Sequence, residues 1–227
     1  MRGWIKPAHS GRLGRLALRA RASQARGVTV HALSLVCTDL APRRGGRTVA
    51  AGVSFTLAPG QALVIRGANG AGKTSVLRAV AGLCGYAGHA AFSAGGVPLD
   101  PAEARARHTH LLGPRDGLAD RLTARETAAF WSGLLGGAPA VAEAGLSGAE
   151  TMPAERLSTG QRRRLGLSRL LGSPRALWLL DEPLSGLDAA GRDLLLGAVA
   201  DHRAGGGLVL MASHEAGLPR APVLRLA

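Results

Sequence analysis

The sequence predicts an α/β fold in which helices cover a parallel sheet, with a β-segment before it and a helical segment inserted in it. Three observations support this prediction. An apolar run at residues 62–65 leads through a glycine-rich turn into an amphipathic stretch. From residue 160 onward, helical and apolar strand patterns alternate, as is typical of a parallel sheet. Between residues 29 and 60 the pattern is one of short strands and glycine turns, which favours an antiparallel arrangement.

The first expected elements are short strands. Residues 30–36 alternate loosely between apolar and polar types, and residues 48–57 follow a Gly45-Gly46 turn. A second hairpin is expected from residues 89–92 and 97–99, which flank another pair of glycines. These segments are too short and too regularly broken for helices, so they predict the N-terminal antiparallel β-segment.

Helices are expected after the glycine-rich turn and again in the middle of the chain. The first should cover residues 74–84 and end just before Gly85, since glycine commonly follows the last helical residue. Residues 101–156 should be mostly helical, with Thr123 and Glu126 forming a capping box at the start of one helix.

The last third of the chain alternates between helices and strands. We expect helices at 160–171 and 189–202, and buried strands at 177–182 and 207–212. Strands that alternate with helices in this way usually lie parallel in one sheet. No internal repeat or long linker divides the chain.

The glycine-rich turn carries a phosphate-binding pattern of two glycines with four residues between them, followed by Lys-Thr. Its backbone N–H groups and the following helix N-terminus can point at phosphate oxygens. Lys73 adds a positive charge at the β- and γ-phosphates, and the Thr74 hydroxyl suits Mg²⁺. A chance glycine turn is the alternative, but the strand before it and the helix after it favour a nucleoside triphosphate site. The expected binding residues are Gly67, Ala68, Asn69, Gly70, Ala71, Gly72, Lys73, Thr74 and Ser75.

Two carboxylates end the apolar strand at 177–182. Asp181 is placed to join Thr74 at Mg²⁺, because hard oxygen ligands suit this ion. Glu182 lies one residue further on and would point differently, which suits a base that polarises the attacking water. Alone, this pair could be a strand end that turns into solvent.

Leu157-Ser158-Thr159-Gly160-Gln161 resembles the signature motif of ABC ATPases, with Thr159 in place of the first glycine. Residues 183–188 are similar to the D-loop of that family, and Ser213-His214 is similar to its switch histidine. Read singly, the signature could be a helix cap and His214 a surface histidine. The shared order of the motifs favours the family, and the resemblance covers roughly residues 29–227.

The resemblance implies the P-loop NTPase fold of an ABC ATPase over residues 29–227: a parallel sheet, an N-terminal antiparallel β subdomain and a helical subdomain at about 101–158. It implies ATP and Mg²⁺ as cofactors, with Glu182 and His214 as catalytic residues. It also implies a head-to-tail homodimer that sandwiches ATP between Lys73 of one copy and the signature of the other. The signature residues are Ser158, Thr159, Gly160 and Gln161.

Several segments are similar to the ATP-binding subunit of the cytochrome c maturation haem exporter, the CcmA family. They are residues 39–47, 110–118, Leu122-Thr123 and Phe130-Trp131, with Pro114 and Glu126-Thr127-Ala128 as departures from the family pattern. This resemblance implies ATP-driven haem export or delivery in c-type cytochrome biogenesis. It further implies integral membrane Ccm partners of the CcmB/CcmC type, and a peripheral location on the cytoplasmic face of the bacterial inner membrane.

Other functions stay open at this point. The nearest alternative is the ATPase subunit of an ABC transporter with another substrate. ABC proteins of DNA repair or translation carry long insertions or two fused ATPase halves, for which 227 residues leave no room. A non-hydrolysing nucleotide switch is disfavoured because both Glu182 and His214 are present.

The composition of the chain restricts its possible partners and its possible class. The net charge of +13 invites a nucleic-acid function, but residues 1–38 hold seven basic residues and no acid, so the remainder is much less basic. We therefore expect no nucleic-acid partner. Two cysteines give no disulfide framework, and no apolar stretch is long enough for a membrane span.

Residues 1–28 form a basic extension with little periodicity. We expect it to be disordered, or untranslated if synthesis starts at Val28. A basic helix on an anionic membrane and a transit peptide are the alternatives.

Two departures from the ABC pattern bear on the mechanism. No glutamine lies between Lys73 and Gln161, and Arg115 stands where the family has its lid glutamine. Arginine cannot bind Mg²⁺, but it could approach the γ-phosphate or a partner subunit. Phe55 is the only aromatic residue between 29 and 60, so adenine stacking is expected to fall to Arg44.

Overall fold

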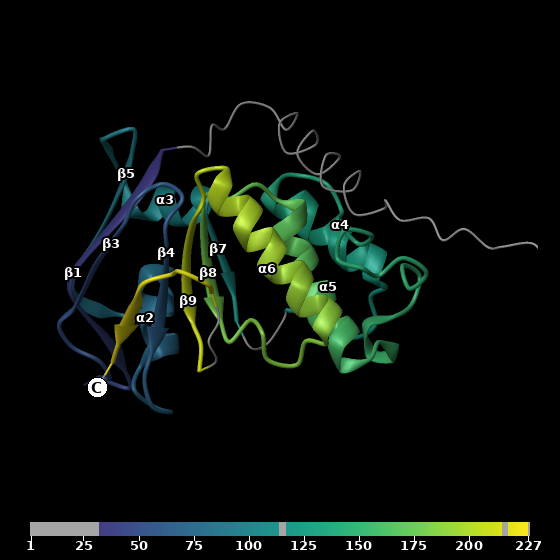
Figure 1. Ribbon diagram of the computed structural model, residues 1–227, viewed down its shortest axis with the longest axis horizontal. Helices are drawn as coiled ribbons and strands as arrows, with labels where there is room; N and C mark the ends of the chain where they lie inside the picture. The colour runs from purple at the N-terminus through teal and green to yellow at the C-terminus, as the bar shows by residue number, and fades with distance from the viewer. Residues whose placement is uncertain (1–31, 114–116, 215–217, 227) are drawn as a thin grey trace, which may run out of the picture.

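The computed structural model describes residues 32–113, 117–214 and 218–226, which form two β-sheets and a set of helices in layers (Figure 1). The basic extension, Pro114 and Arg115 lie outside the described residues. An antiparallel sheet forms one outer layer, and a parallel sheet lies at the centre of the molecule. No helix in the described ranges is long and apolar enough to cross a membrane.

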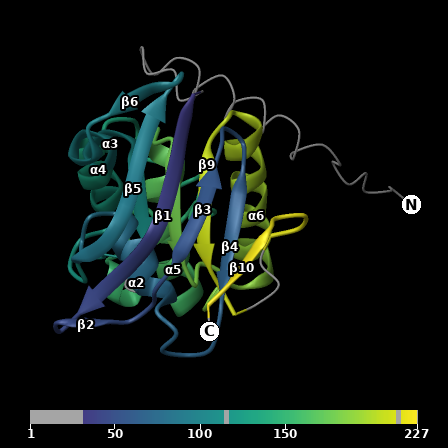
Figure 2. The same cartoon turned by 90° about the vertical axis from the view of Figure 1, so that its left-hand side faces the viewer.

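The antiparallel sheet has the order β2-β1-β5-β6, with β3 also paired to β1, and its outer face is seen in Figure 2. Its strands are β1 (Leu33–Arg44), β2 (Arg47–Thr48), β3 (Val53–Leu57), β5 (Tyr86–Ala94) and β6 (Val97–Leu99). The expected antiparallel β-segment and the β5–β6 hairpin are therefore present.

Strand β1 is longer than the alternation at 30–36 predicted. Its pairing register shifts between Cys37 and Leu40, where Asp39 has a left-handed φ of 49°. The Asp39 backbone N–H donates to the Ser54 hydroxyl, 2.9 Å away. A bulge of this kind breaks the period-2 pattern, which explains why the sequence underestimates the strand.

The central sheet has the order β10-β4-β9-β8-β7, and every neighbouring pair is parallel. Each residue of β8 and β9 is buried, as expected for a parallel sheet covered on both faces. Its strands are β4 (Ala62–Arg66), β7 (Thr109–Leu112), β8 (Leu177–Asp181), β9 (Leu208–Ala212) and β10 (Val223–Arg225).

Strands β7 and β10 were not predicted. Residues 109–112 fall in the segment expected to be helical, yet they pair with β8 in the central sheet. Strand β10 lies beside β4, and the Leu226 backbone N–H donates to the Arg66 carbonyl at 2.7 Å. Both strands are only three or four residues long, so their patterns are too short to identify from sequence.

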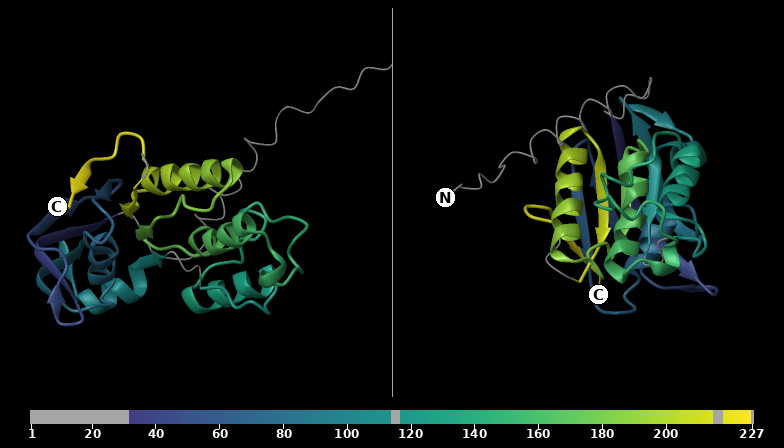
Figure 3. Two further views of the ribbon diagram at one scale, coloured as in Figure 1. Left: turned by 90° about the horizontal axis from the view of Figure 1, so that it is seen from below. Right: turned by 90° about the vertical axis from the view of Figure 1, so that its right-hand side faces the viewer.

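The helices fill the space around the central sheet. Helix α2 packs between the two sheets, while α5 and α6 cover the opposite face of the central sheet (Figures 1 and 3). The helices are α2 (Lys73–Val80), α3 (Pro101–His108), α4 (Ala124–Leu135), α5 (Thr159–Gly172) and α6 (Ala189–Ala204).

Helix α2 ends at Val80, earlier than predicted; Ala81 is its C-cap, and the glycine just past the cap is Gly82 rather than Gly85. Gly82 has a left-handed φ of 73°. The Gly82 N–H donates to the Ala79 carbonyl and the Leu83 N–H to the Arg78 carbonyl, which is the Schellman pattern of a helix end.

The middle of the chain is less helical than predicted. Beyond α3 and β7, the described part of it holds α4, a short 3₁₀ turn at Ala154–Arg156 and a series of turns. The capping box at the start of α4 is confirmed: the Glu126 N–H donates to the Thr123 hydroxyl and the Thr123 N–H to the Glu126 carboxylate. This region and the first turns of α5 share their own apolar cluster.

Candidate nucleotide-binding site

A pocket opens at the carboxyl ends of β4, β8 and β9, the edge at which parallel α/β sheets usually bind ligands. The phosphate loop follows β4, the acidic pair ends β8, and His214 follows β9. Because these strands are neighbours in one parallel sheet, the three segments meet although they are far apart in sequence. The pocket is lined by Arg44, Val49, Asn69, Gly70, Gly72, Lys73, Thr74, Ser75, Asp181, Glu182 and His214.

Lys73 is buried at the first residue of α2, with 7% of its surface exposed. Its ammonium donates to the carbonyls of Gly67 and Ala68, at 2.9 and 3.0 Å. Gly72 makes the turn into the helix with a left-handed φ of 95°, and a Cβ there would lie 2.9 Å from the Val49 carbonyl oxygen. The loop therefore closes around the lysine, which faces the pocket.

Thr74 and Asp181 are in direct contact. The Thr74 hydroxyl donates to an Asp181 carboxylate oxygen, Oδ1, at 3.1 Å. Burial raises the pKa of Asp181, and the hydrogen bond from Thr74 partly opposes this effect. The two side chains present oxygen donors side by side, which are the ligands that Mg²⁺ prefers. Across the described residues, no group of three or more His, Cys, Asp and Glu side chains could hold a metal ion.

Glu182 faces His214 rather than Thr74. Its Oε1 lies 3.2 Å from the His214 Nε2, and its Oε2 accepts from the His214 backbone N–H at 3.3 Å. Glu182 has a left-handed φ of 46°, which is rare for a non-glycine residue and common at functional sites. Asp181, which ends β8, and Glu182, which follows it, thus point to different partners.

Arg44 lies at the rim of the pocket, at the end of β1. It is exposed and stands opposite Arg47 across the β1–β2 hairpin. Val49, which follows β2, also lines the pocket, although sequence reasoning gave it no role. An aliphatic side chain carries no chemical signal, so only its position after the hairpin could have identified it.

A family model described as ABC transporter matches residues 50–185, more than half of the chain. The matched segment contains the phosphate loop, the signature motif, and the acidic pair Asp181 and Glu182. This chain belongs to the ABC transporter ATP-binding family.

Relatives of this ABC ATPase carry the name cytochrome c biogenesis ATP-binding export protein CcmA. The protein from Rhodopseudomonas palustris (strain BisB5) is 47% identical over 76% of this chain and 87% of its own. The protein from Paramagnetospirillum magneticum (strain AMB-1) is 42% identical over 87% of this chain and 94% of its own.

Solved structures agree on the fold. A putative ABC transporter ATP-binding protein from Pyrococcus furiosus superposes with a TM-score of 0.71 at 20% identity, covering 85% of this chain and 97% of that one. The structure of an ATP-binding subunit of an ABC transporter gives a TM-score of 0.68 at 23% identity, over 79% of each chain. The predicted α/β fold of an ABC ATPase is therefore confirmed.

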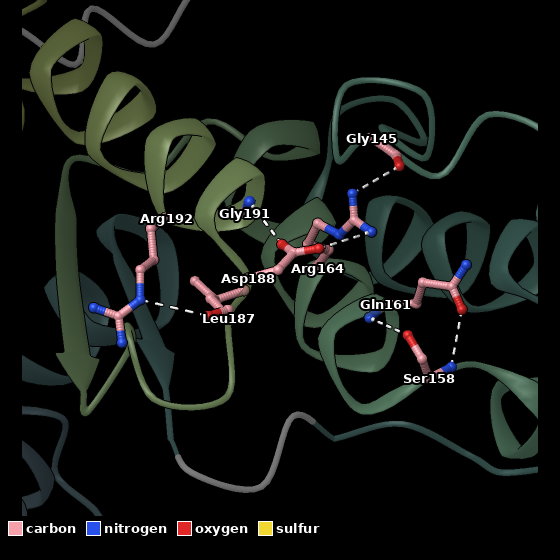
Figure 4. Close-up of polar contacts among 8 residues, drawn as sticks. All are labelled: Gly145, Ser158, Gln161, Arg164, Leu187, Asp188, Gly191 and Arg192. Carbon is pink, nitrogen blue, oxygen red and sulfur yellow. Dashed lines mark hydrogen bonds and ion pairs between the residues drawn. The ribbon is translucent and has the colours of Figure 1, made fainter.

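The signature of this ABC ATPase lies at the N-terminus of α5 (Figure 4). The Gln161 N–H donates to the Ser158 hydroxyl at 3.2 Å, and the Ser158 N–H donates to the Gln161 side-chain oxygen at 2.9 Å. The motif thus forms a capping box in addition to any role at a nucleotide. Among the described residues that line the pocket, none comes from the signature.

Gly160 has no packing reason to be glycine within its own chain. A Cβ at this position would meet nothing closer than 3.8 Å, the nearest atoms belonging to Asp188 and Gly186. The position is helical and only partly buried, so an alanine would fit and would favour the helix. A glycine here leaves the N-terminus of α5 open to close approach from outside.

Sequence reasoning also missed Arg163. It is a buried arginine, 5% exposed, in the run Arg162-Arg163-Arg164 that follows the signature. Three successive side chains on a helix point in different directions, so the run could have indicated that its arginines have different surroundings.

Proposed function

We propose that this chain is the ATP-hydrolysing subunit of an ABC transporter complex for haem export or delivery in c-type cytochrome biogenesis. The single observation that carries the proposal is its identity of 42–47% with CcmA proteins over most of the chain. The pocket at the edge of the central sheet supports the reaction, because it gathers a lysine, a hydroxyl, two carboxylates and a histidine.

The residues of the pocket have separate roles in the proposed reaction. The loop N–H groups and Lys73 bind the β- and γ-phosphates, where the ammonium exchanges backbone carbonyls for phosphate oxygens. Glu182 orients the attacking water and accepts its proton. His214, hydrogen-bonded to the same carboxylate, holds Glu182 in place and contacts the γ-phosphate.

Thr74 and Asp181 would hold Mg²⁺ with the phosphates. When bound, this ion neutralises charge that develops between the β- and γ-phosphates. The contact between the two side chains fits the proposal, since only two protein oxygens are needed where phosphates and waters complete the ligand set.

A homodimer would complete the site. Ser158, Thr159, Gly160 and Gln161 stand at the N-terminus of a 14-residue helix, where a γ-phosphate is electrostatically favoured. They do not line the pocket of their own chain. A second copy arranged head-to-tail would bring its signature to the ATP held by Lys73.

The proposal extends to membrane partners, because the matching family model is described as ABC transporter and the relatives are named export proteins. We infer integral membrane subunits of the CcmB/CcmC type, with this chain bound peripherally on the cytoplasmic face of the bacterial inner membrane. The lobe formed by α4 and the turns after it stands away from the antiparallel sheet, as Figure 3 shows, and would make the contact.

The proposal is tested by replacing the protein in its source strain with Glu182→Gln and staining membranes for covalently bound haem. We expect c-type cytochromes to disappear, and the purified variant to lose ATP hydrolysis by on the order of 100-fold or more. The matched control is Glu103→Gln, an exposed glutamate that forms an ion pair with Arg107 on the same helix.

Three outcomes separate the parts of the proposal. Loss of both staining and hydrolysis in Glu182→Gln, with Glu103→Gln normal, supports it. Normal staining despite lost hydrolysis would mean an ABC ATPase with a different cargo. Unchanged hydrolysis would overturn the role of Glu182.

A further inference from the structure

Helix α5 connects the signature to the segment that contains Glu182. The signature caps the first turn of the helix, and three arginines follow in the next turn. Arg162 points outward, where it pairs with Asp120 and donates to the Ala154 carbonyl. Arg163 and Arg164 instead contact the segments that follow β7 and β8. The three positions therefore have different surroundings despite their identical chemistry.

Arg163 is buried against the ends of two strands of the central sheet. One terminal nitrogen, Nη1, donates to the Gly113 carbonyl, and the other, Nη2, donates to the Glu182 carbonyl, each at 2.9 Å. A guanidinium has a fixed planar geometry, so two bonds of this kind fix the distance and direction between their acceptors. Arg163 thus joins α5 to the backbone of Glu182.

The Glu182 backbone needs such support. Its left-handed φ is unfavourable for a residue with a Cβ, by roughly 1 kcal/mol or more. Its N–H donates to the Ala212 carbonyl at 2.9 Å, while its carbonyl accepts from Arg163 and, at 3.2 Å, from the Ser185 N–H. A rotation of the backbone at Glu182 would also change the direction of its side chain. The hydrogen bond from Arg163 to the Glu182 carbonyl therefore helps to fix where the carboxylate points.

Arg164 holds the other end of the same segment (Figure 4). It lies 3.5 Å from the Asp188 carboxylate and donates to the Gly145 carbonyl at 3.2 Å. Asp188 in turn caps α6 by accepting from the Gly191 N–H at 2.8 Å. Residues 182–188 are therefore tied to α5 at both ends, by Arg163 at Glu182 and by Arg164 at Asp188.

We propose that Arg163 is a positioning residue for ATP hydrolysis, which aligns the Glu182 carboxylate with the signature helix through the Glu182 carbonyl. In the dimer, a nucleotide that engages the signature fixes the N-terminus of α5. Arg163 lies about one turn further along the helix and donates to the Glu182 carbonyl. The position of the helix therefore determines the position of the Glu182 backbone in the same chain. This inference rests on the proposed ATPase function and dimer.

The first test is the ATPase activity of Arg163→Gln. We expect kcat to fall on the order of ten- to 100-fold, while the affinity for ATP, measured with a fluorescent analogue, stays within about twofold. Arg162→Gln is the matched control, because it removes the same charge from the neighbouring position and should keep kcat within about twofold.

The second test asks whether Arg163 acts through Glu182. In a Glu182→Gln background, Arg163→Gln should lower the residual rate no further, because the group it positions is already absent. A merely structural role would reduce the residual rate again, and that additive result would overturn the proposal. An unchanged kcat in Arg163→Gln would overturn it as well.

Removal of a buried guanidinium leaves two carbonyls without this donor, so Arg163→Gln could fail to fold. Circular dichroism shows whether the variant is folded. If it is not, Arg163→Lys is used to test the positioning role. Lysine keeps the charge but lacks the planar fork, so kcat should fall while ATP affinity is retained; a wild-type kcat in this variant would overturn the inference. A wild-type protein without ATPase activity would instead contradict the proposed function.

Discussion

Lys73, Asp181 and Glu182 place one positive and two negative charges around a single pocket, and each is held by a different kind of partner. Lys73 rests on backbone carbonyls, Asp181 on the Thr74 hydroxyl, and Glu182 on His214. The ammonium of Lys73 is attracted more strongly to an anionic phosphate oxygen than to a neutral carbonyl. A triphosphate is therefore expected to replace the carbonyl partners of Lys73.

At the rim of this pocket, we propose that the planar cation of Arg44 stacks on the nucleotide base. Its replacement by alanine should weaken ATP binding, because a guanidinium over an aromatic ring contributes about 0.5–2 kcal/mol. We expect the Kd for ATP to rise roughly two- to 30-fold at that energy. Titration with a fluorescent ATP analogue measures the change.

Arg47→Ala is the control for this prediction. Arg47 is exposed on the same hairpin, opposite Arg44, but does not line the pocket. It should leave the Kd nearly unchanged. Equal Kd values for both variants and the wild type would exclude a stacking role for Arg44.

At the scale of elements, α6 is fixed to the central sheet by an aromatic stack. The His202 ring lies parallel to the Trp178 ring of β8, with centroids 4.0 Å apart and an interplanar angle of 6°. The His202 Nε2 lies 3.1 Å from the Ala176 carbonyl oxygen. Burial of the ring favours its neutral form, because a charged imidazolium would be poorly solvated there.

This stack should make stability depend on pH. Burial lowers the pKa of His202 from 6.5 to about 4, so between these values the unfolded chain binds a proton that the folded chain does not. The free energy of unfolding should therefore fall as the pH falls from 6.5 toward 4, and be unaffected by His202 above that range. Thermal melts at a series of pH values measure the effect.

His202→Phe separates this histidine from the other groups that titrate in the same range. Phenylalanine can keep the stack on Trp178 but cannot take up a proton, so the fall in melting temperature below pH 6.5 should become shallower. Burial also lowers the pKa of His110, to about 3. His110 should therefore still make the melting temperature of this variant depend on pH. An unchanged slope would mean that His202 contributes nothing to it.

At the scale of the whole molecule, the pocket and the signature belong to different regions. The pocket lies at the edge of the central sheet, whereas the signature begins α5 beside the lobe that holds α4. Since the signature does not line the pocket of its own chain, the proposed site needs two copies. The proposed dimer would account for a glycine at position 160 that its own chain does not require for packing.

The dimer can be tested with Glu182→Gln, which should retain bound ATP. Size-exclusion chromatography with light scattering should detect a dimer in ATP and a monomer without it. Adding Gly160→Glu should abolish the dimer, because its carboxylate would repel the γ-phosphate. Gly197→Glu is the control, as this exposed α6 glycine also has open space for a side chain.

Persistence of the ATP-dependent dimer in the Gly160→Glu variant would contradict the proposed position of the signature. A monomer in all conditions, with ATP still bound, would contradict the homodimer itself.

The sequence was most informative where chemistry restricts the residue type. The phosphate loop, the acidic pair and His214 could be placed at one sheet edge because parallel strands deliver their ends together. Strand β7 could not be predicted, since four residues flanked by helical patterns carry too little periodicity. Arg163 was missed because its partners are backbone carbonyls, which leave no trace in the sequence.

The C-terminal strand β10 has a practical consequence. It lies along β4, and the Leu226 carbonyl oxygen would be only 2.8 Å from a Cβ at Gly67, the first residue of the phosphate loop. A purification tag fused directly behind β10 would therefore emerge beside the nucleotide and could weaken its binding by crowding alone. An affinity handle ahead of Leu33, which begins β1 in the other sheet and does not line the pocket, gives the cleaner protein for every assay described above.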